Sequence, residues 1–468
     1  MPTLAVLGAG PKGIAIAAKA RAMEAAGLGA PRVVLIDPGA VAGNWSGRQG
    51  YTNGLLPLGT PPEKDVGFPY ADSWGPVSPA VTAAMADYTW QRHLITRGAY
   101  ADWVDRGRTR PTHRQWSWYL REVAEKAQAE IIAADVVGLE ADGERWQVTV
   151  EPGETIEADG VVITGAGPPI RVTGQQDGHP RVLDGRSYWL HEHAISTRVA
   201  QNVCVIGSGE TAASVVISLV SKLPKHSSVD VLTSRGVLYS RGESYEENRL
   251  YSDPGDWPGL AEAHRREFLV RTDRGVVSLQ AEAVLNQSRG FRTLAGRAAA
   301  IQAGERQVVV TIEYGDEREH VAYDLVVVAI GFEPRWFEGL LGVQARHRLD
   351  QAVRGDASAE AQVARRDAPH VDAIDRIGSR RQLGQRLEDH VLALLAEPAA
   401  GGANRTAELH LVGHDGHELD VVLHLRAGVG DAHLVGRVAV PLGEGPGARD
   451  QGGVLDFKFL ADGHDQLD

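Results

Sequence analysis

LAVLGAGPKGIAIAAKARAMEAA, at residues 4–26, begins with four apolar residues, passes through three glycines and ends in an alanine-rich run. Apolar residues that lead into a glycine turn predict a short buried strand, and the alanine-rich run predicts a helix. A second apolar strand at residues 33–36 ends at Asp37. This order predicts a βαβ unit, with which a doubly wound α/β domain begins.

The glycines of this turn have the spacing G-x-G-x-x-G. The first permits the tight turn, the second lets the backbone approach a pyrophosphate, and the third lets the helix pack on the strand. Asp37 at the end of the second strand is placed to accept a ribose hydroxyl. The pattern predicts a dinucleotide site formed by Gly8, Gly10, Pro11, Lys12, Gly13 and Asp37.

The same pattern restarts at residues 203–232 with a strand, a G-x-G-x-x-A turn, a helix and a strand. This turn is Gly207-Ser208-Gly209-Glu210-Thr211-Ala212, and its second strand leads to Arg235 in place of an acid. An arginine there can pair with a 2′-phosphate that an acid would repel, which favours NADPH over NADH. The alternative for Arg235 is a solvated surface charge.

Two such turns on one chain, the second nested in the domain of the first, predict a flavin that is reduced by a nicotinamide. We expect a doubly wound FAD-binding Rossmann-like domain with an inserted NADPH-binding Rossmann-like domain. The loops around Trp45 and at residues 58–70 are expected to cover the flavin, and Gly331 to contact FAD after the strand at 325–330. The expected limits are 1–195 for the first part of the FAD domain, 196–324 for the NADPH domain, 325–340 for a return strand to the FAD domain, and 341–468 for an atypical segment.

The bulk composition excludes several other classes of protein. The net charge of −13 leaves no basic face for nucleic acid. The single cysteine, Cys204, cannot form an internal disulfide or a metal cluster, and the chain has no C-x-x-C motif for disulfide reduction. No apolar run reaches the roughly 18–20 residues of a membrane span, and the opening lacks a basic leader. We therefore expect a multidomain cytoplasmic enzyme with small-molecule partners.

The stretch from residue 43 to residue 120 is rich in glycine, proline and tryptophan and has weak periodicity. Such a composition is typical of loops that build a site. Thr112 is expected to be the N-cap of an amphipathic helix that runs through Ala129.

Two further segments resemble a known enzyme family: LGTPPEKDVGFPY at 58–70 and YEENRLYSDP at 245–254. They are similar to the N-hydroxylating flavin monooxygenases of siderophore biosynthesis, and within these to the branch that hydroxylates the side-chain amine of lysine for mycobactin-type siderophores in actinobacteria. The resemblance covers residues 3–337, and its supporting segments are DRGR at 105–108, PTHRQW at 111–116, RGE at 241–243 and RTDRG at 271–275.

The resemblance implies a mechanism. NADPH reduces FAD, molecular oxygen adds to the reduced ring, and the resulting flavin hydroperoxide transfers its distal oxygen to the amine of L-lysine or acyl-lysine. No side chain is assigned to the chemical step, which takes place on the flavin. The amine must attack in its neutral form, and its ordinary pKa of about 10.4 leaves little of that form at pH 7. The family is often oligomeric, so a homo-oligomer is implied as well.

The resemblance also assigns roles to individual residues. Lys64 is expected to hold the substrate carboxylate and to touch NADPH, and Asn248 to hold the amino-acid end of the substrate. Asp273 lies where ornithine-specific members have an asparagine, and Gly59 where they have a glutamine. Without the resemblance, Lys64 would be a surface lysine and Asn248 a turn residue. The NADPH contacts expected are Gly207, Ser208, Gly209, Glu210, Thr211, Arg235, Asp273 and Lys64.

The last third of the chain departs from the family. After residue 337 the only aromatic residues are Phe457 and Phe459, and the segment that closes over the flavin in family members is not found in 341–468. Two interpretations stay open: a small β module rich in alanine and valine, or a GC-rich coding region read out of frame.

Three other activities are open at this point. The substrate could be L-ornithine. The enzyme could be a Baeyer–Villiger or sulfur-oxidising monooxygenase, but these have a histidine four residues after a glycine, and here Gly185 is followed by His191, six residues later. Finally, the chain could bind nucleotides without productive catalysis.

Overall fold

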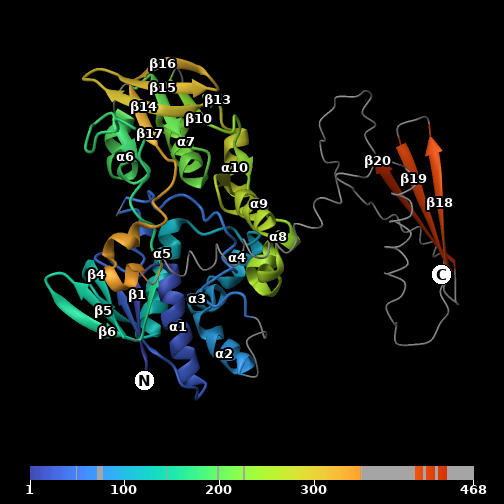
Figure 1. Cartoon of the computed structure of the whole chain (residues 1–468). Coiled ribbons are helices and arrows are strands. Elements are labelled where there is room, and N and C mark those ends of the chain that lie inside the picture. The colour runs from blue at the N-terminus through green and yellow to red at the C-terminus, as the bar shows by residue number, and fades with distance from the viewer. Residues whose placement is uncertain are drawn as a thin grey trace. The chain divides into compact units, whose positions relative to one another are not determined.

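The computed structural model describes residues 1–48, 50–70, 77–143, 145–197, 200–224, 227–347 and 349, together with three strands between residues 406 and 439 (Figure 1). Contacts divide the chain into the units Met1–Ala352 and Val353–Asp468. No helix within the described residues is long and apolar enough to cross a membrane.

The first sheet is parallel and has the strand order β3-β2-β1-β7. The central strand β1 pairs with β2 on one side and with β7 on the other, so the carboxyl ends of all three meet at one edge. The predicted strand–turn–helix–strand order is confirmed here. The strands are β1 (Thr3–Leu7), β2 (Arg32–Ile36), β3 (Glu130–Ile132) and β7 (Gly160–Ile163).

The two faces of this sheet are covered by different layers. Val6 and Leu35 pack against the helices α1 (Pro11–Ala25) and α5 (His113–Lys126). Neighbouring residues point to the opposite face because side chains alternate along a strand. That face packs on the antiparallel sheet β4 (Val136–Asp142), β5 (Arg145–Val150) and β6 (Glu154–Ala158). Thr112 is the N-cap of α5, as predicted, and forms a capping box with Gln115.

The second sheet is also parallel and has the order β13-β10-β9-β17-β8. Helices including α7 lie on one face, and the antiparallel sheet β14-β15-β16 on the other, as the upper part of Figure 1 shows. The parallel strands are β8 (Val182–Asp184), β9 (Asn202–Ile206), β10 (Ser228–Thr233), β13 (Phe291–Ala295) and β17 (Leu325–Val328). The covering elements are α6 (Ser187–Thr197), α7 (Glu210–Lys222), α10 (Leu279–Gln287), β14 (Arg297–Ala303), β15 (Val308–Tyr314) and β16 (Glu317–Tyr323).

The limits of the two nucleotide domains differ from those we expected. Strand β8 pairs with β17, and side chains of α6 belong to the core of the second sheet, so residues 182–195 do not belong to the first domain. The strand at Leu325–Val328 likewise lies in the second sheet. The chain returns to the first domain only after it, where η4 (Trp336–Leu340) contacts β4. These domain limits depend on the pairing of strands that are far apart in the sequence. The strand β8 has only three residues, which is too short for a periodic pattern that would show the sheet to which it belongs.

We expected loops in the stretch between residues 43 and 120, but the structure has several short helices there. Large apolar residues such as Trp90 and Met85 are buried in the first core and stabilise these helices. Its elements are η1 (Gly43–Trp45), α2 (Ser78–Met85), η2 (Ala86–Tyr88), α3 (Trp90–Thr96) and α4 (Tyr100–Asp105). After β10 the chain forms β11 (Tyr239–Ser240), α8 (Tyr245–Ser252), η3 (Pro254–Gly259), α9 (Glu262–Thr272) and β12 (Val276–Val277).

In the unit Val353–Asp468, the described residues form one antiparallel sheet. Its strands are β18 (Thr406–His414), β19 (Glu418–Arg426) and β20 (Asp431–Ala439). The remaining residues of the atypical segment after 349 lie outside the described part of the chain.

Candidate functional site

The first glycine turn leaves open space at the start of α1. Gly8 has a φ of +115°, and a Cβ added there would lie 2.5 Å from Thr164 Oγ1. A Cβ added at Gly13 would lie 2.2 Å from the Gly8 carbonyl oxygen, whereas one at Gly10 would meet nothing within 4 Å. The fold itself therefore requires the first and third glycines, and the second keeps the helix N-terminus open. Free N–H groups at such a terminus fit a pyrophosphate.

A cavity of about 500 Å³ opens at this turn. One Asp37 oxygen accepts a hydrogen bond from the Ala9 N–H at 2.8 Å, and the other accepts one from the Gly39 N–H at 2.8 Å. The carboxylate is thereby fixed in the cavity wall, where a ribose can reach it. These groups fit the nucleotide half of FAD, and the predicted residues that line the cavity are Gly8, Gly10, Pro11, Lys12, Asp37 and Trp45.

Aromatic side chains also line this cavity. Trp45 stands edge-on to His113, with ring centroids 4.9 Å apart, and His113 Nδ1 lies 2.8 Å from Thr52 Oγ1. Burial lowers the pKa of His113 to about 4, so this imidazole is neutral at pH 7. Sequence reasoning missed His113 and Thr52 as site residues. The PTHRQW segment was noted, but nothing in its pattern shows which side chain faces a cavity.

The second glycine turn repeats the backbone of the first. Gly207 has a φ of +145°, and an added Cβ would lie 2.3 Å from the Ala329 carbonyl oxygen. Gly209 is the N-cap of α7, and Ala212 takes the place of the third glycine and is fully buried. The turn is therefore built to present the N-terminus of α7.

A larger cavity, of about 1270 Å³, adjoins this turn. Five arginines and Lys12 line it, against the three acids Glu210, Asp273 and Glu333. Such an excess of positive charge suits a dinucleotide that carries a further phosphate. Gly331 lies here, and not in the first cavity, while Lys12 lines both. The predicted NADPH residues that line this cavity are Gly207, Ser208, Gly209, Glu210, Thr211, Arg235 and Asp273.

The structure shows how three of these residues are held. Arg235 donates to the carbonyl oxygens of Arg274 at 3.1 Å and Gly275 at 3.4 Å, so its guanidinium lies along the cavity wall. Asp273 is ion-paired with Arg274, at 3.1 Å. The Glu210 carboxylate accepts hydrogen bonds from Ser278 N at 2.6 Å and Ser278 Oγ at 2.8 Å. Glu210 therefore uses its side chain to join α7 to the start of α10.

The two predicted substrate-binding residues contact each other. Lys64 Nζ donates to Asn248 Oδ1 at 2.5 Å, although the residues are 184 positions apart. The Asn248 amide is oriented by donating to the carbonyl oxygens of Glu243 at 2.7 Å and Ser244 at 3.0 Å. Burial lowers the pKa of Lys64, and the nearby Glu243 partly opposes that shift. Neither Lys64 nor Asn248 lines the two nucleotide cavities.

A second contact between the same two segments lies next to this pair. Arg241 donates through Nη2 to the Gly59 carbonyl oxygen at 2.6 Å, and through Nε to Glu243 Oε1 at 2.8 Å. A Cβ added at Gly59 would lie 3.1 Å from Glu210 Oε1, so glycine allows this close approach. Arg241 and Glu243 were noted in the sequence only as part of a segment. Their position next to Lys64 follows from tertiary structure.

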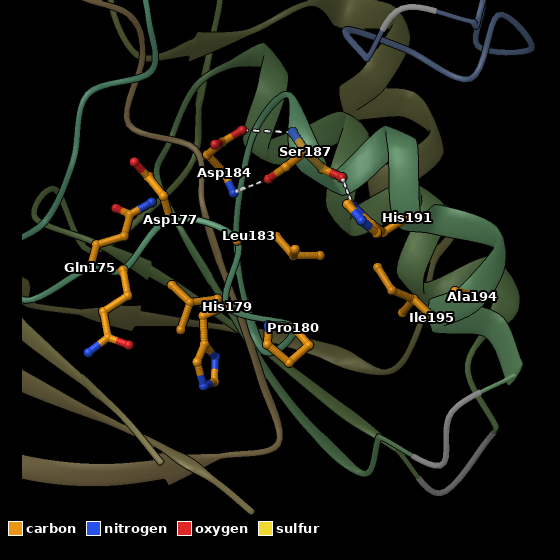
Figure 2. Close-up of a pocket in the computed structure, with 13 residues that line it drawn as sticks. Gln175, Asp177, His179, Pro180, Leu183, Asp184, Ser187, His191, Ala194 and Ile195 are labelled. Atoms are coloured by element: carbon orange, nitrogen blue, oxygen red, sulfur yellow. Dashed lines mark hydrogen bonds between the residues drawn. The ribbon is translucent and has the colours of Figure 1, made fainter. Parts of the chain in front are cut away.

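A third cavity, of about 280 Å³, lies between the loop at 175–180 and α6 (Figure 2). None of the predicted site residues lines it. Its His191 donates from Nδ1 to the Ser187 carbonyl oxygen at 2.8 Å, one turn earlier in α6. His191 thus makes a bond within its own helix and lines neither of the cavities at the glycine turns. Among the described residues no group of three or more His, Cys, Asp or Glu is placed to hold a metal ion.

Several known proteins are similar to this chain. The sequence profile of the L-lysine 6-monooxygenase/L-ornithine 5-monooxygenase family matches residues 80–287. An L-lysine N6-monooxygenase, MbtG, from Mycobacterium sp. strain MCS is 37% identical over 365 residues, which are 76% of this chain and 83% of the relative. MbtG from Mycobacterium tuberculosis H37Rv is also 37% identical, over 77% of this chain and 83% of its own length.

Solved structures extend the likeness to the fold. The lysine monooxygenase NbtG from Nocardia farcinica, described as having an unprecedented NADPH domain conformation, is 36% identical with a TM-score of 0.64 and covers 75% of this chain and 86% of its own. The ornithine N-hydroxylase KtzI from Kutzneria sp. 744, with reduced FAD, NADP⁺ and L-ornithine, has a TM-score of 0.59 at 17% identity, over 73% of this chain and 84% of its own, and shows the fold alone. With its two nucleotide turns and these relatives, the chain belongs to the L-lysine 6-monooxygenase/L-ornithine 5-monooxygenase family of enzymes that use FAD and NADPH.

Proposed function

We propose that this enzyme hydroxylates the side-chain amine of L-lysine, with NADPH and molecular oxygen, in the biosynthesis of a hydroxamate siderophore. The observation that carries the proposal is the contact between Lys64 and Asn248 at 2.5 Å. It brings a cation and an oriented amide together beside the junction of the two nucleotide domains. The names of the relatives that are 37% identical to this chain support lysine as the substrate.

The charges of this pair suit the amino-acid end of a substrate. The Lys64 ammonium can pair with an α-carboxylate, and the Asn248 Oδ1 atom can accept from an α-ammonium group. Because the Asn248 amide nitrogen donates its hydrogen bonds to the carbonyl oxygens of Glu243 and Ser244, the amide oxygen must face Lys64. A bound amino acid would insert between the two side chains and replace their mutual hydrogen bond.

The side-chain amine of the substrate would then extend away from this pair toward the flavin. FAD, when bound, supplies the chemistry that activates oxygen. The amine reacts only when neutral, and an ordinary pKa of about 10.4 leaves roughly 0.04% neutral at pH 7. Burial of the amine away from water would raise that fraction, because desolvation disfavours the charged form.

Three finer points belong to the same proposal. The substrate is free L-lysine or an acyl-lysine whose side-chain amine is unmodified, and both have the α-carboxylate that Lys64 suits. The enzyme works in the cytoplasm, which the single cysteine and the need for NADPH support. A homo-oligomer is expected from the family resemblance.

Product analysis tests this function. The purified full chain is incubated with FAD, NADPH and oxygen, together with L-lysine, N2-acetyl-L-lysine or L-ornithine, and hydroxylated product is measured by mass spectrometry. We expect product from lysine or from its acyl derivative and much less from ornithine. No product from any of the three, with FAD bound, would overturn the proposal. A preparation that stays colourless with added FAD would instead support the reading as a nucleotide-binding protein without catalysis.

A further inference from the structure

His113 occupies a place in the first nucleotide cavity that neither the glycine turn nor Asp37 explains. It is the first residue of α5, directly after the N-cap Thr112, and lines the cavity together with Trp45 and Thr52. Its Nδ1 atom is bonded to Thr52 Oγ1 at 2.8 Å, and no described residue is bonded to its Nε2 atom. One ring nitrogen is therefore held by the protein and the other is left for a ligand.

The hydrogen-bond pattern of Thr52 indicates which nitrogen of His113 carries the proton. Thr52 is 4% exposed, and its Oγ1 already accepts a hydrogen bond from the Gly54 N–H at 3.1 Å. A buried hydroxyl also needs an acceptor for its own hydrogen. Within the described part of the chain, that acceptor is His113 Nδ1. The Thr52 hydroxyl therefore donates to Nδ1, and the proton of the neutral imidazole is on Nε2.

The surroundings of His113 keep the ring uncharged. Burial lowers the pKa of His113 to about 4, and no carboxylate opposes this shift. The Trp45 ring stands edge-on at 4.9 Å and restricts the orientation of the imidazole. At pH 7 the residue thus offers one neutral N–H donor in a fixed direction.

We propose that His113 donates a hydrogen bond from Nε2 to an acceptor atom at the flavin end of FAD, and that Thr52 selects the tautomer able to do so. The same cavity is lined by the open helix N-terminus at Gly10 and the carboxylate of Asp37, which suit the pyrophosphate and ribose. The wall formed by Trp45, Thr52 and His113 is left for the ring system, whose carbonyl oxygens and ring nitrogens accept hydrogen bonds. This inference rests on FAD as the cofactor and not on lysine as the substrate.

Two amide substitutions at position 113 separate the roles of the ring nitrogens. The amide nitrogen of glutamine can replace Nε2, whereas that of asparagine reaches only the position of Nδ1. We expect His113→Gln to keep the FAD dissociation constant within about twofold of the wild-type value, and His113→Asn to raise it about tenfold. The constant is measured by titrating FAD into the FAD-free full chain and following flavin fluorescence. The visible absorption bands of bound FAD should shift in His113→Asn and remain in place in His113→Gln.

Thr52 supplies an independent pair of variants. Thr52→Ser keeps the hydroxyl and should leave FAD binding unchanged, while Thr52→Val removes it and should weaken binding about threefold. His93→Gln is the matched control, because His93 is buried in the same domain, is bonded to Glu122 and does not line the cavity.

The outcomes are distinct. Equal FAD affinity for the Gln and Asn variants at position 113, or for the Ser and Val variants at position 52, would overturn the proposal. Because these titrations contain no lysine, they can fail while the lysine hydroxylation test succeeds, and the reverse.

Discussion

The two glycine turns share one backbone design and differ in the residues that complete it. Gly8 and Gly207 have φ values of +115° and +145°. The second glycine of each turn, Gly10 or Gly209, is the N-cap of the following helix. The third position is Gly13 in the first turn and the buried Ala212 in the second. The difference shows that the first two positions serve the backbone of both turns, while the third depends on local packing of helix against strand.

The larger difference lies at the end of the second strand of each unit. In the first, Asp37 is fixed by the N–H groups of Ala9 and Gly39. In the second, Arg235 lies against the carbonyl oxygens of Arg274 and Gly275. Opposite charges at equivalent places suit a ribose hydroxyl in one site and a phosphate in the other. We therefore propose that the shared backbone binds a dinucleotide in each unit, and that this one position distinguishes between dinucleotides.

The largest effect is expected for Gly13→Ala. The new Cβ would lie 2.2 Å from the Gly8 carbonyl oxygen, so α1 must move away from β1. We expect the free energy of unfolding of the FAD-free chain to fall by about 3 kcal/mol, measured by urea denaturation. Gly10→Ala is the control, because its Cβ would meet no protein atom and should weaken FAD binding without changing FAD-free stability. Equal stability of the two variants would contradict this interpretation of the turn.

The next effect concerns the charge at the second turn. Arg235→Ala removes the cation expected to bind the 2′-phosphate, so kcat/KM for NADPH should fall about 10- to 100-fold while that for NADH changes less than about threefold. Steady-state oxidation of each cofactor measures this. Arg21→Ala is the matched control, since Arg21 is an exposed residue of α1 paired with Glu24. An equal loss of kcat/KM with NADPH and with NADH would show that Arg235 does not bind the 2′-phosphate.

A third prediction contrasts how the two cavities respond to pH. Arginine side chains in general carry their charge throughout this pH range, whereas the pKa of His113 is about 4 in the fold against 6.5 for an ordinary histidine. As pH falls, position 113 is protonated in the unfolded chain before it is protonated in the folded chain. The contribution of the neutral His113 to the free energy of unfolding is therefore fully present above pH 6.5 and is lost between pH 6.5 and pH 4. From pH 7.5 to pH 5 the loss is about 2 kcal/mol.

This loss is measured by urea denaturation of the FAD-free chain at the two pH values. His113→Gln should lose about 2 kcal/mol less than the wild type over the same interval. Parallel pH profiles for the two proteins would show that His113 does not titrate in the way its burial implies.

The smallest effect is expected for Ala212→Gly, which gives the second turn the third glycine of the first. Removal of a buried methyl group from α7 should cost about 1 kcal/mol of stability, because glycine is a poorer helix former. The NADPH dissociation constant should stay within about twofold, as measured by NADPH fluorescence titration. A tenfold change would mean that Ala212 contributes to nucleotide binding and not only to packing.

Both glycine turns and most of the strands beside them could be predicted because their signals are local. Residues 4–13 and 203–212 each contain a strand, a turn and a helix start within ten positions. The capping box at Thr112 and Gln115 is local as well, and the N-cap of α5 was predicted correctly. The resemblance to the family added Lys64 and Asn248, which no local pattern marks as a pair.

Other features could not be predicted from local patterns. Strand β8 has three residues, and only its pairing with β17 places it in the second sheet. His113 looks like any polar residue in the first turn of a helix, and its burial depends on Trp45 and Thr52, which lie more than 60 positions earlier. Arg241 meets the carbonyl oxygen of Gly59 across 182 positions.

The sequence by itself determined that the chain has two βαβ units whose glycine turns suit dinucleotides, because glycine spacing, helix capping and the charge at Asp37 and Arg235 act within a few residues. Tertiary structure decided which sheet each connecting strand joined, which side chains faced the cavities, and that Lys64 met Asn248. The physical reason is that backbone conformation depends on neighbouring residues, whereas burial, pKa shifts and contacts between distant segments depend on packing of the whole chain.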